Sequence, residues 1–174
     1  MIFGILIVLA ALVAFIAFVN SKPNTFQLER SILIDAPPAK IRPLIENFRR
    51  WTAWSPWEKL DPDLQRTYSG ADEGVGAAYA WQGNGKAGAG RMEITGSTPE
   101  QTALSLDFLK PFKASNITEF SYLPEGPATR VNWRMSGPQP FIGKLMHTVF
   151  NMDKLVGKDF EAGLAALKRA VEEG

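Results

Sequence analysis

Residues 152–173 of this chain, MDKLVGKDFEAGLAALKRAVEE, decide the fold that the sequence predicts. Apolar side chains recur along this stretch at the spacing of an α-helix, and charged side chains occupy many of the positions between them. The apolar positions are Val156, Phe160, Leu164, Leu167 and Val171. A helix with one such stripe owes most of its stability to packing the stripe on another apolar face. The rest of the chain must supply that face.

The segments that precede this helix alternate polar and apolar residues, as antiparallel strands do. In residues 129–136, TRVNWRMS, the side chains of Val131, Trp133 and Met135 fall on one face. Further strands are predicted at 26–35, 64–68, 77–82, 89–96, 102–109 and 115–123. The sequence therefore predicts an α+β domain, in which a curved antiparallel sheet of about seven strands packs around the long C-terminal helix.

At the N-terminus, residues 2–19 carry no charged or strongly polar side chain. As a helix they would rise about 1.5 Å per residue, or about 27 Å in total, which nearly matches the hydrocarbon thickness of a bilayer. A cleaved signal peptide has basic residues ahead of a shorter apolar core and a small-x-small cleavage site, none of which is found here. A buried helix of the domain would show a polar stripe. We therefore predict a transmembrane anchor at 1–20, a linker at 21–24 and a folded domain at 25–174.

The composition excludes several kinds of site and partner. The chain has 174 residues, and its 19 basic and 18 acidic side chains give a net charge of +1, so we expect no nucleic-acid partner. It contains no cysteine and one histidine, His147, so we expect no disulfide, no usual zinc site and no cofactor. Lys22 and Arg30 follow the predicted anchor, and the positive-inside rule then favours a cytoplasmic domain.

Several short motifs are distinctive. They are the helix start at Pro37-Pro38, Trp54-Ser-Pro-Trp57, Gly74-Val-Gly76 ahead of Tyr79-Ala-Trp81, and the stretch from Phe150 to Phe160. Together they resemble the SRPBCC superfamily, which includes START lipid-transfer domains, the birch-pollen allergen and polyketide cyclase/dehydrase-like proteins. The likeness covers Phe26 to about Val171 and is closest to bacterial polyketide cyclase/dehydrase-like members, some of which carry an N-terminal anchor. It implies a helix-grip fold but no particular activity, because lipid carriers, cyclases, hydrolases and chaperone activators share that fold.

Residues 83–88, Gly-Asn-Gly-Lys-Ala-Gly, match the G-x-G-x-x-G pattern of dinucleotide-binding sites. That site needs a strand before the pattern and a helix after it, whereas strands are predicted on both sides here. Asn84-Gly85 is instead the favoured pair of a two-residue type I′ hairpin turn. We therefore predict a hairpin at this position.

The charged residues of the predicted strands provide candidate acids and bases. Arg91, Glu93 and Asp107 oppose apolar neighbours and are expected to face solvent. Glu119 is ambiguous, because its strand has apolar residues on both faces. We expect Glu119 to face solvent as well. In the alternative, Glu119 or Arg134 is an inward polar group with a shifted pKa, as an enzyme would need.

Aromatic residues and methionines supply much of the predicted core, and flexible methionines suit an adaptable apolar pocket. If the sheet curves more than the helix can fill, a cavity remains between them. The residues predicted to contact an apolar ligand there are Trp57, Tyr79, Trp81, Phe108, Phe120, Trp133, Met135, Met152, Val156 and Phe160. No residue is assigned a catalytic role or a metal.

These patterns predict a membrane-anchored module that binds a hydrophobic small molecule or a lipid. A polyketide cyclase/dehydrase-like enzyme and a protein-interaction scaffold are the alternatives. The enzyme needs a polar group inside the cavity, and the scaffold is favoured by a filled interior. The sequence identifies neither the ligand nor a protein partner nor the oligomeric state.

Overall fold

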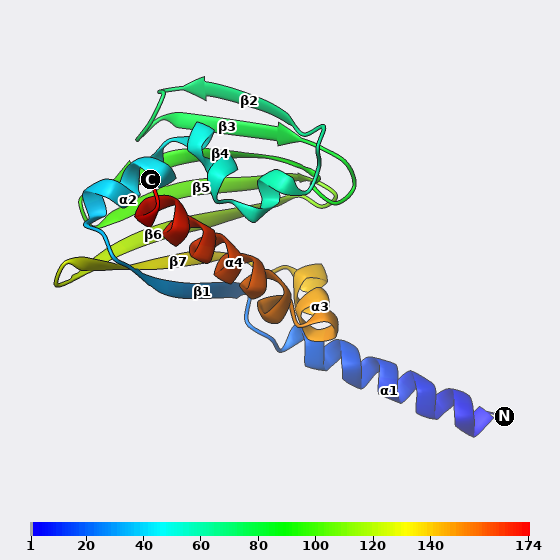
Figure 1. The fold of residues 1–174 in the computed structure, drawn as a ribbon. Helices are drawn as coiled ribbons and strands as arrows, with labels where there is room; N and C mark the ends of the chain where they lie inside the picture. The colour runs from blue at the N-terminus through cyan, green and yellow to red at the C-terminus, as the bar shows by residue number, and fades with distance from the viewer. Residues whose placement is uncertain (1) are drawn as a thin grey trace.

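The computed structural model describes residues 2–174, apart from the side chains of residues 2 and 152. The elements are, in chain order and with η for 3-10 helices, α1 (Ile2–Asn20), β1 (Thr25–Ile34), α2 (Pro38–Glu46), η1 (Phe48–Ala53), η2 (Pro56–Lys59), β2 (Gln65–Gly70), β3 (Ala77–Gln82), β4 (Ala89–Ser97), β5 (Gln101–Lys110), β6 (Ala114–Glu125), β7 (Ala128–Pro138), α3 (Phe141–Phe150) and α4 (Met152–Glu172). Helix α4 lies across one face of the sheet, and α1 projects away from the domain (Figure 1).

Within the described residues, the strands form one seven-stranded antiparallel sheet in the order β1-β7-β6-β5-β4-β3-β2. Because neighbouring strands are antiparallel, successive turns alternate between the two ends of the sheet. The β3–β4 and β5–β6 turns therefore lie at the same end as the start of β1, which follows α1; this is the α1 end. The β2–β3, β4–β5 and β6–β7 turns lie at the opposite, far end (Figure 1).

The concave face of the sheet is solidly filled at its far end. Helix α2, the 3-10 helix η1 and the C-terminal half of α4 pack there against the strands. The large apolar side chains with almost no exposure include Ile34, Ile41, Ile45, Ile94, Leu104, Phe120, Val131, Leu164 and Leu167. This packed core fixes α4 on the sheet, as its apolar stripe predicts.

The Trp54-Ser-Pro-Trp57 motif forms part of the cover over the concave face. Trp54 is buried, and its indole Nε1 donates to the Leu44 carbonyl at 2.9 Å. Trp51 likewise donates to the Ile45 carbonyl at 2.8 Å. Both hydrogen bonds tie η1 and the residue after it to the end of α2. Pro56 begins a new short helix, η2, which carries Trp57 toward α4.

Helix α1 is not part of this core. Among the residues that the structure describes, Phe3–Asn20 is the one stretch long and apolar enough to cross a membrane, and only 6% of it is buried. A core helix of similar composition would be mostly buried. The helix therefore presents its apolar surface to something other than its own domain.

The predicted α+β helix-grip architecture is confirmed, and so is the β3–β4 hairpin. The two-residue type I′ turn is wrong. That turn needs a positive φ at both Asn84 and Gly85, whereas the positive φ, 62°, occurs at Gly88. The connection is longer because Asn84 Oδ1 accepts a hydrogen bond from the backbone of Lys86 at 2.9 Å and so forms a local turn of its own.

Candidate ligand-binding cavity

A cavity of about 570 Å³ lies between helix α4 and the concave face of the sheet, toward the α1 end. The strands show the division clearly. On β6, Phe120 belongs to the packed core, whereas Asn116 and Thr118 line the cavity. On β5, Leu104 is core and Phe108 is cavity wall. Pockets for small organic ligands typically measure roughly 300–1,000 Å³, and this one falls in that range.

Most of the residues predicted to bind a ligand line this cavity. They are Tyr79, Trp81, Phe108, Trp133 and Met135 from the sheet, and Trp57, Val156 and Phe160 from η2 and α4. Phe160 stacks on Trp133 with 4.1 Å between ring centroids, and Trp57 packs edge-on against Phe160 at 5.9 Å. These three rings form the wall where α4 and η2 meet the sheet. Contact with a ligand stays a prediction for all eight residues.

One predicted residue, Phe120, is placed differently. Phe120 is fully buried in the packed core, where it stacks on Trp133 at 4.9 Å and meets the edges of Trp51 and Trp54. Alternation gave the correct face of the sheet for Phe120, but it carries no information on how far along that face the core extends. The side chain of Met152 lies outside the described part of the structure.

A buried carboxylate, Glu58, lines the cavity and is not predicted from the sequence. Its residue is only 8% exposed. Tyr79 Oη donates to Glu58 Oε1 at 2.6 Å, and Arg66 Nε donates to Oε2 at 2.7 Å. Burial, together with the hydrogen bond to Glu58, raises the pKa of Tyr79 far above its usual value, so the phenol keeps its proton. Glu58 lies in a single 3-10 turn, where no periodic pattern marks an inward position.

A few other polar groups interrupt the apolar wall. Asn116 Nδ2 lies 4.0 Å from the sulfur of Met135, which is a weak acceptor. Among the described residues, Thr118 Oγ1 and Trp133 Nε1 have no hydrogen-bond partner. Asn116 and Thr118 alternate in step with Phe120 on β6, so the sequence pattern is enough to place them on the same face of the sheet. An apolar wall with a few polar atoms is the usual composition of a small-molecule site.

The cavity opens at the α1 end of the sheet. Deep in the cavity, the lining residues Ser55 and Tyr79 are buried. At the other end, three lining residues in or beside the β3–β4 and β5–β6 turns are exposed: Lys86, Lys110 and Phe112, of which Phe112 is 68% exposed. This gradient of exposure places the mouth between the two turns and helix α3.

His147 of α3 stands at this mouth, with its ring centroid 5.5 Å from that of Phe26 on β1. Burial lowers the pKa of His147 below its usual value, and the nearby charge of Asp153 opposes this shift. The imidazole is therefore neutral at neutral pH. His147 of α3 therefore adds no positive charge to the mouth.

The charged strand residues Arg91, Glu93, Glu119 and Arg134 lie on the convex face, because they alternate with inward-facing neighbours. Arg134 Nε donates to Glu119 at 2.9 Å, and the side chain of Gln101 also donates to Glu119. Arg91 pairs with Glu93 at 2.6 Å. Glu119 and Arg134 are absent from the described lining of the cavity, so neither is the inward polar group that an enzyme would need.

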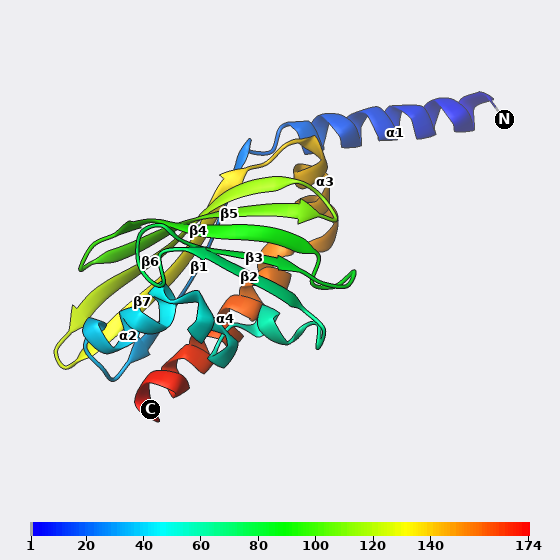
Figure 2. The ribbon, with the colours of Figure 1, turned by 90° about the horizontal axis from the view of Figure 1, so that it is seen from above.

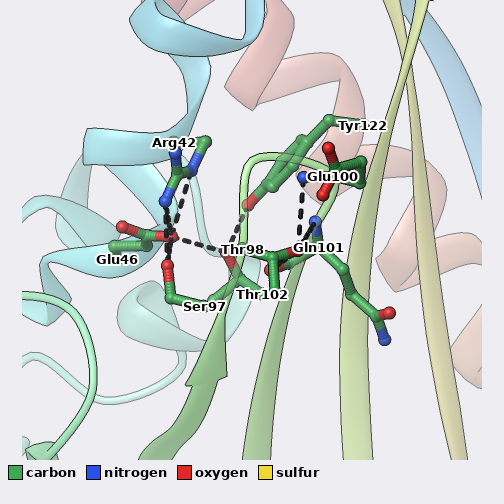
Figure 3. Close-up of polar contacts among 8 residues, drawn as sticks. All are labelled: Arg42, Glu46, Ser97, Thr98, Glu100, Gln101, Thr102 and Tyr122. Atoms are coloured by element: carbon green, nitrogen blue, oxygen red, sulfur yellow. Dashed lines mark hydrogen bonds and ion pairs between the residues drawn. The ribbon is translucent and has the colours of Figure 1, made fainter.

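A second polar cluster joins α2 to the far end of the sheet (Figure 3). Glu46 Oε1 accepts hydrogen bonds from Ser97 at 2.7 Å, Thr102 at 2.8 Å and Arg42 at 3.1 Å. Thr102 Oγ1 also lies 2.8 Å from Tyr122 Oη, whose pKa burial raises strongly. Glu46 is the last residue of α2, and Ser97 and Thr102 are on β4 and β5, so these hydrogen bonds hold α2 on the sheet. Within residues 2–174, no group of three His, Asp or Glu side chains is placed to hold a metal ion.

The sheet, the helix that it grips and the cavity between them define a helix-grip domain of the SRPBCC class. The family model described as "Polyketide cyclase / dehydrase and lipid transport" matches residues 25–172. The chain therefore belongs to the polyketide cyclase/dehydrase and lipid transport family. No curated protein matches the chain.

Solved structures with the same fold come from several bacteria. TTHA0849 from Thermus thermophilus has a TM-score of 0.60 and 19% identity, covering 85% of this chain and 98% of its own. The Aha1 dimer from Colwellia psychrerythraea has a TM-score of 0.58 and 18% identity, covering 84% of this chain and 96% of its own. Protein CV1439 from Chromobacterium violaceum has a TM-score of 0.58 and 16% identity, covering 87% of this chain and 99% of its own. At these identities the likeness establishes the fold alone.

Proposed function

We propose that the chain is a membrane-anchored module that binds a hydrophobic small molecule or a lipid in the cavity between the sheet and α4. The observation that carries this proposal is the cavity of about 570 Å³, with its wall of aromatic rings and Met92 and Met135. Protein interiors otherwise pack without large voids, so a cavity of this size is the expected place for a ligand. The family description, which includes lipid transport, supports the same interpretation.

Helix α1 supports the anchoring part of the proposal. We assign residues 1–20 to a transmembrane anchor, 21–24 to a linker and 25–174 to the binding domain. Lys22 Nζ lies 4.2 Å from the centroid of the Phe18 ring, at the end of the helix. A lysine at the end of a spanning helix places its ammonium at the headgroups while its carbon stem stays on apolar surface. The positive charges of Lys22 and Arg30 favour the cytoplasmic side for the domain.

Photolabelling in the native membrane tests both parts. Cells that make the full chain are fed a fatty acid with a diazirine on its acyl chain, so that their own lipids carry the photoreactive group. After irradiation, the adducts are mapped onto peptides of the chain. We expect adducts on α1 and on the strands that line the cavity, β5 and β7 above all.

The pattern of adducts separates the two parts. Labelling confined to α1 would contradict lipid binding in the cavity and leave the anchor standing. A mature chain in the aqueous fraction that begins after residue 20 would show that α1 is a cleaved signal peptide and contradict the anchor.

A second candidate function is an enzyme, and one observation favours it: the carboxylate of Glu58 is buried, lines the cavity and is bonded to the Tyr79 phenol. A buried carboxylate next to a bound substrate is a candidate general base. Mass spectrometry of cell lipids incubated with the chain distinguishes the two functions. A carrier leaves the bound molecule unchanged, whereas an enzyme converts it in a reaction that Glu58→Gln removes. The protein-interaction scaffold, which a filled interior would favour, gains no support from this cavity.

A further inference from the structure

Large apolar side chains are exposed around the mouth of the cavity. On α3 they are Phe141, Ile142, Met146, Val149 and Phe150, with exposed fractions from 37% to 57%. Leu109 near the end of β5 and Phe112 in the β5–β6 turn are 52% and 68% exposed. These residues form the mouth surface. Apolar patches of this kind mark contact with a partner or a membrane rather than with water.

Helix α3 is fixed to the point where α1 leaves the domain. Lys144, on the face of α3 opposite Ile142 and Met146, is only 4% exposed, and its Nζ donates to the carbonyl of Asn20 at 3.0 Å. Asn20 is the last residue of α1. A cation at a helix C-terminus meets the negative end of the helix dipole, so this contact is electrostatically favourable. The mouth surface therefore begins where the proposed anchor ends.

The direction of α3 relative to α1 also indicates what the mouth surface contacts. In both views of the ribbon, α3 runs across the axis of α1 rather than along it (Figures 1 and 2). If α1 crosses a bilayer, a helix that lies across its end extends along the membrane surface. Short amphipathic helices in that position bury their apolar face at the boundary between headgroups and acyl chains.

We propose that the mouth surface lies in the interface of the bilayer that α1 spans, so that the cavity opens directly onto the lipid leaflet. This inference rests on the anchor assigned under the proposed function, and it names the partner of the mouth as lipid. Lys110 and Lys113 flank the apolar tip at Phe112. Their ammonium groups reach headgroups while Phe112 enters the acyl region. A ligand then moves between leaflet and cavity without crossing water.

Single-cysteine variants of the full chain in vesicles test this placement. The natural chain has no cysteine, so one introduced thiol takes up a fluorescent label uniquely. Val149→Cys and Phe112→Cys report on the mouth surface, and Leu9→Cys reports on α1. Leu123→Cys and Val75→Cys are matched controls, because both side chains are 57% exposed and lie at the far end. All five positions are exposed, so the substitutions leave the fold intact.

Quenching by phosphatidylcholine that carries a nitroxide near its headgroup is the readout. We expect quenching at 149 and 112 several-fold above that at 123 and 75. The inference is overturned if labels at 149 and 112 are quenched no more than labels at 123 and 75. The anchor still holds in that case if a nitroxide deep in the acyl chains quenches the label at position 9. No quenching at position 9 would instead overturn the anchor, and the inference with it.

Discussion

Filling the cavity from within is expected to abolish lipid labelling of the sheet without unfolding the domain. Leu106 and Met135 line the cavity from β5 and β7, so replacing both with Trp directs two large rings into it. Because the cavity measures about 570 Å³, these rings fit without the strain that overpacking causes in a close-packed core. We expect the yield of diazirine adducts on the cavity strands to fall at least about tenfold, equivalent to roughly 1.4 kcal/mol of binding free energy. Adducts on α1 should be unchanged.

The matched control for this variant is Ile117→Trp. It introduces the same ring on β6, on the convex face, where Ile117 is 57% exposed. Labelling of the cavity strands should stay at the natural level. If the two-tryptophan variant also keeps full labelling of those strands, lipid contacts the sheet from outside and the cavity is not the binding site.

Removing the ring of Trp133 is expected to lower the free energy of unfolding by about 3–5 kcal/mol. The Trp133→Ala change deletes a side chain that stacks on Phe160 at 4.1 Å and on Phe120 at 4.9 Å. It also removes the edge contacts with Trp54 and Trp57, both at 5.5 Å. The ring is thus the junction between the packed core and the cavity wall. Urea unfolding of the full chain in micelles, followed by near-ultraviolet circular dichroism, measures the loss.

Leu123→Ala is the control for this change, because Leu123 is an exposed residue at the end of the neighbouring strand. We expect a change within about 0.5 kcal/mol. A loss below about 1 kcal/mol for Trp133→Ala would mean that α4 does not depend on this stack for its position.

The fold could be predicted from the sequence because its decisive patterns are periodic. The stripe from Val156 to Val171 requires an apolar partner, and the alternating strands supply the one face available. Parity also assigns side chains to the two faces, which is why the convex placement of Glu119 is correct. Alternation does not predict where along a strand the packed core ends and the cavity begins. Phe120 and Thr118 share a face, yet only the packing of α2 and η1 decides that the first is core and the second is cavity wall.

The polar features of the site lie in segments without a periodic pattern. Glu58 occupies a single 3-10 turn, and its inward direction follows from hydrogen bonds to Tyr79 and Arg66 on two separate strands. The tie between Lys144 and Asn20 joins residues 124 positions apart. Such contacts depend on the assembled fold, so residue order alone could not predict them.

Native mass spectrometry of the full chain, extracted from its own membrane in a polymer nanodisc, tests the central claim most directly. Collisional activation strips loosely held lipid from α1 before it empties a cavity inside the domain. The account predicts one apolar molecule retained for each chain after that lipid has gone, and its absence from the Leu106→Trp, Met135→Trp variant. A chain that carries no small molecule at that stage, or one whose bound molecule persists in the filled variant, would contradict the account.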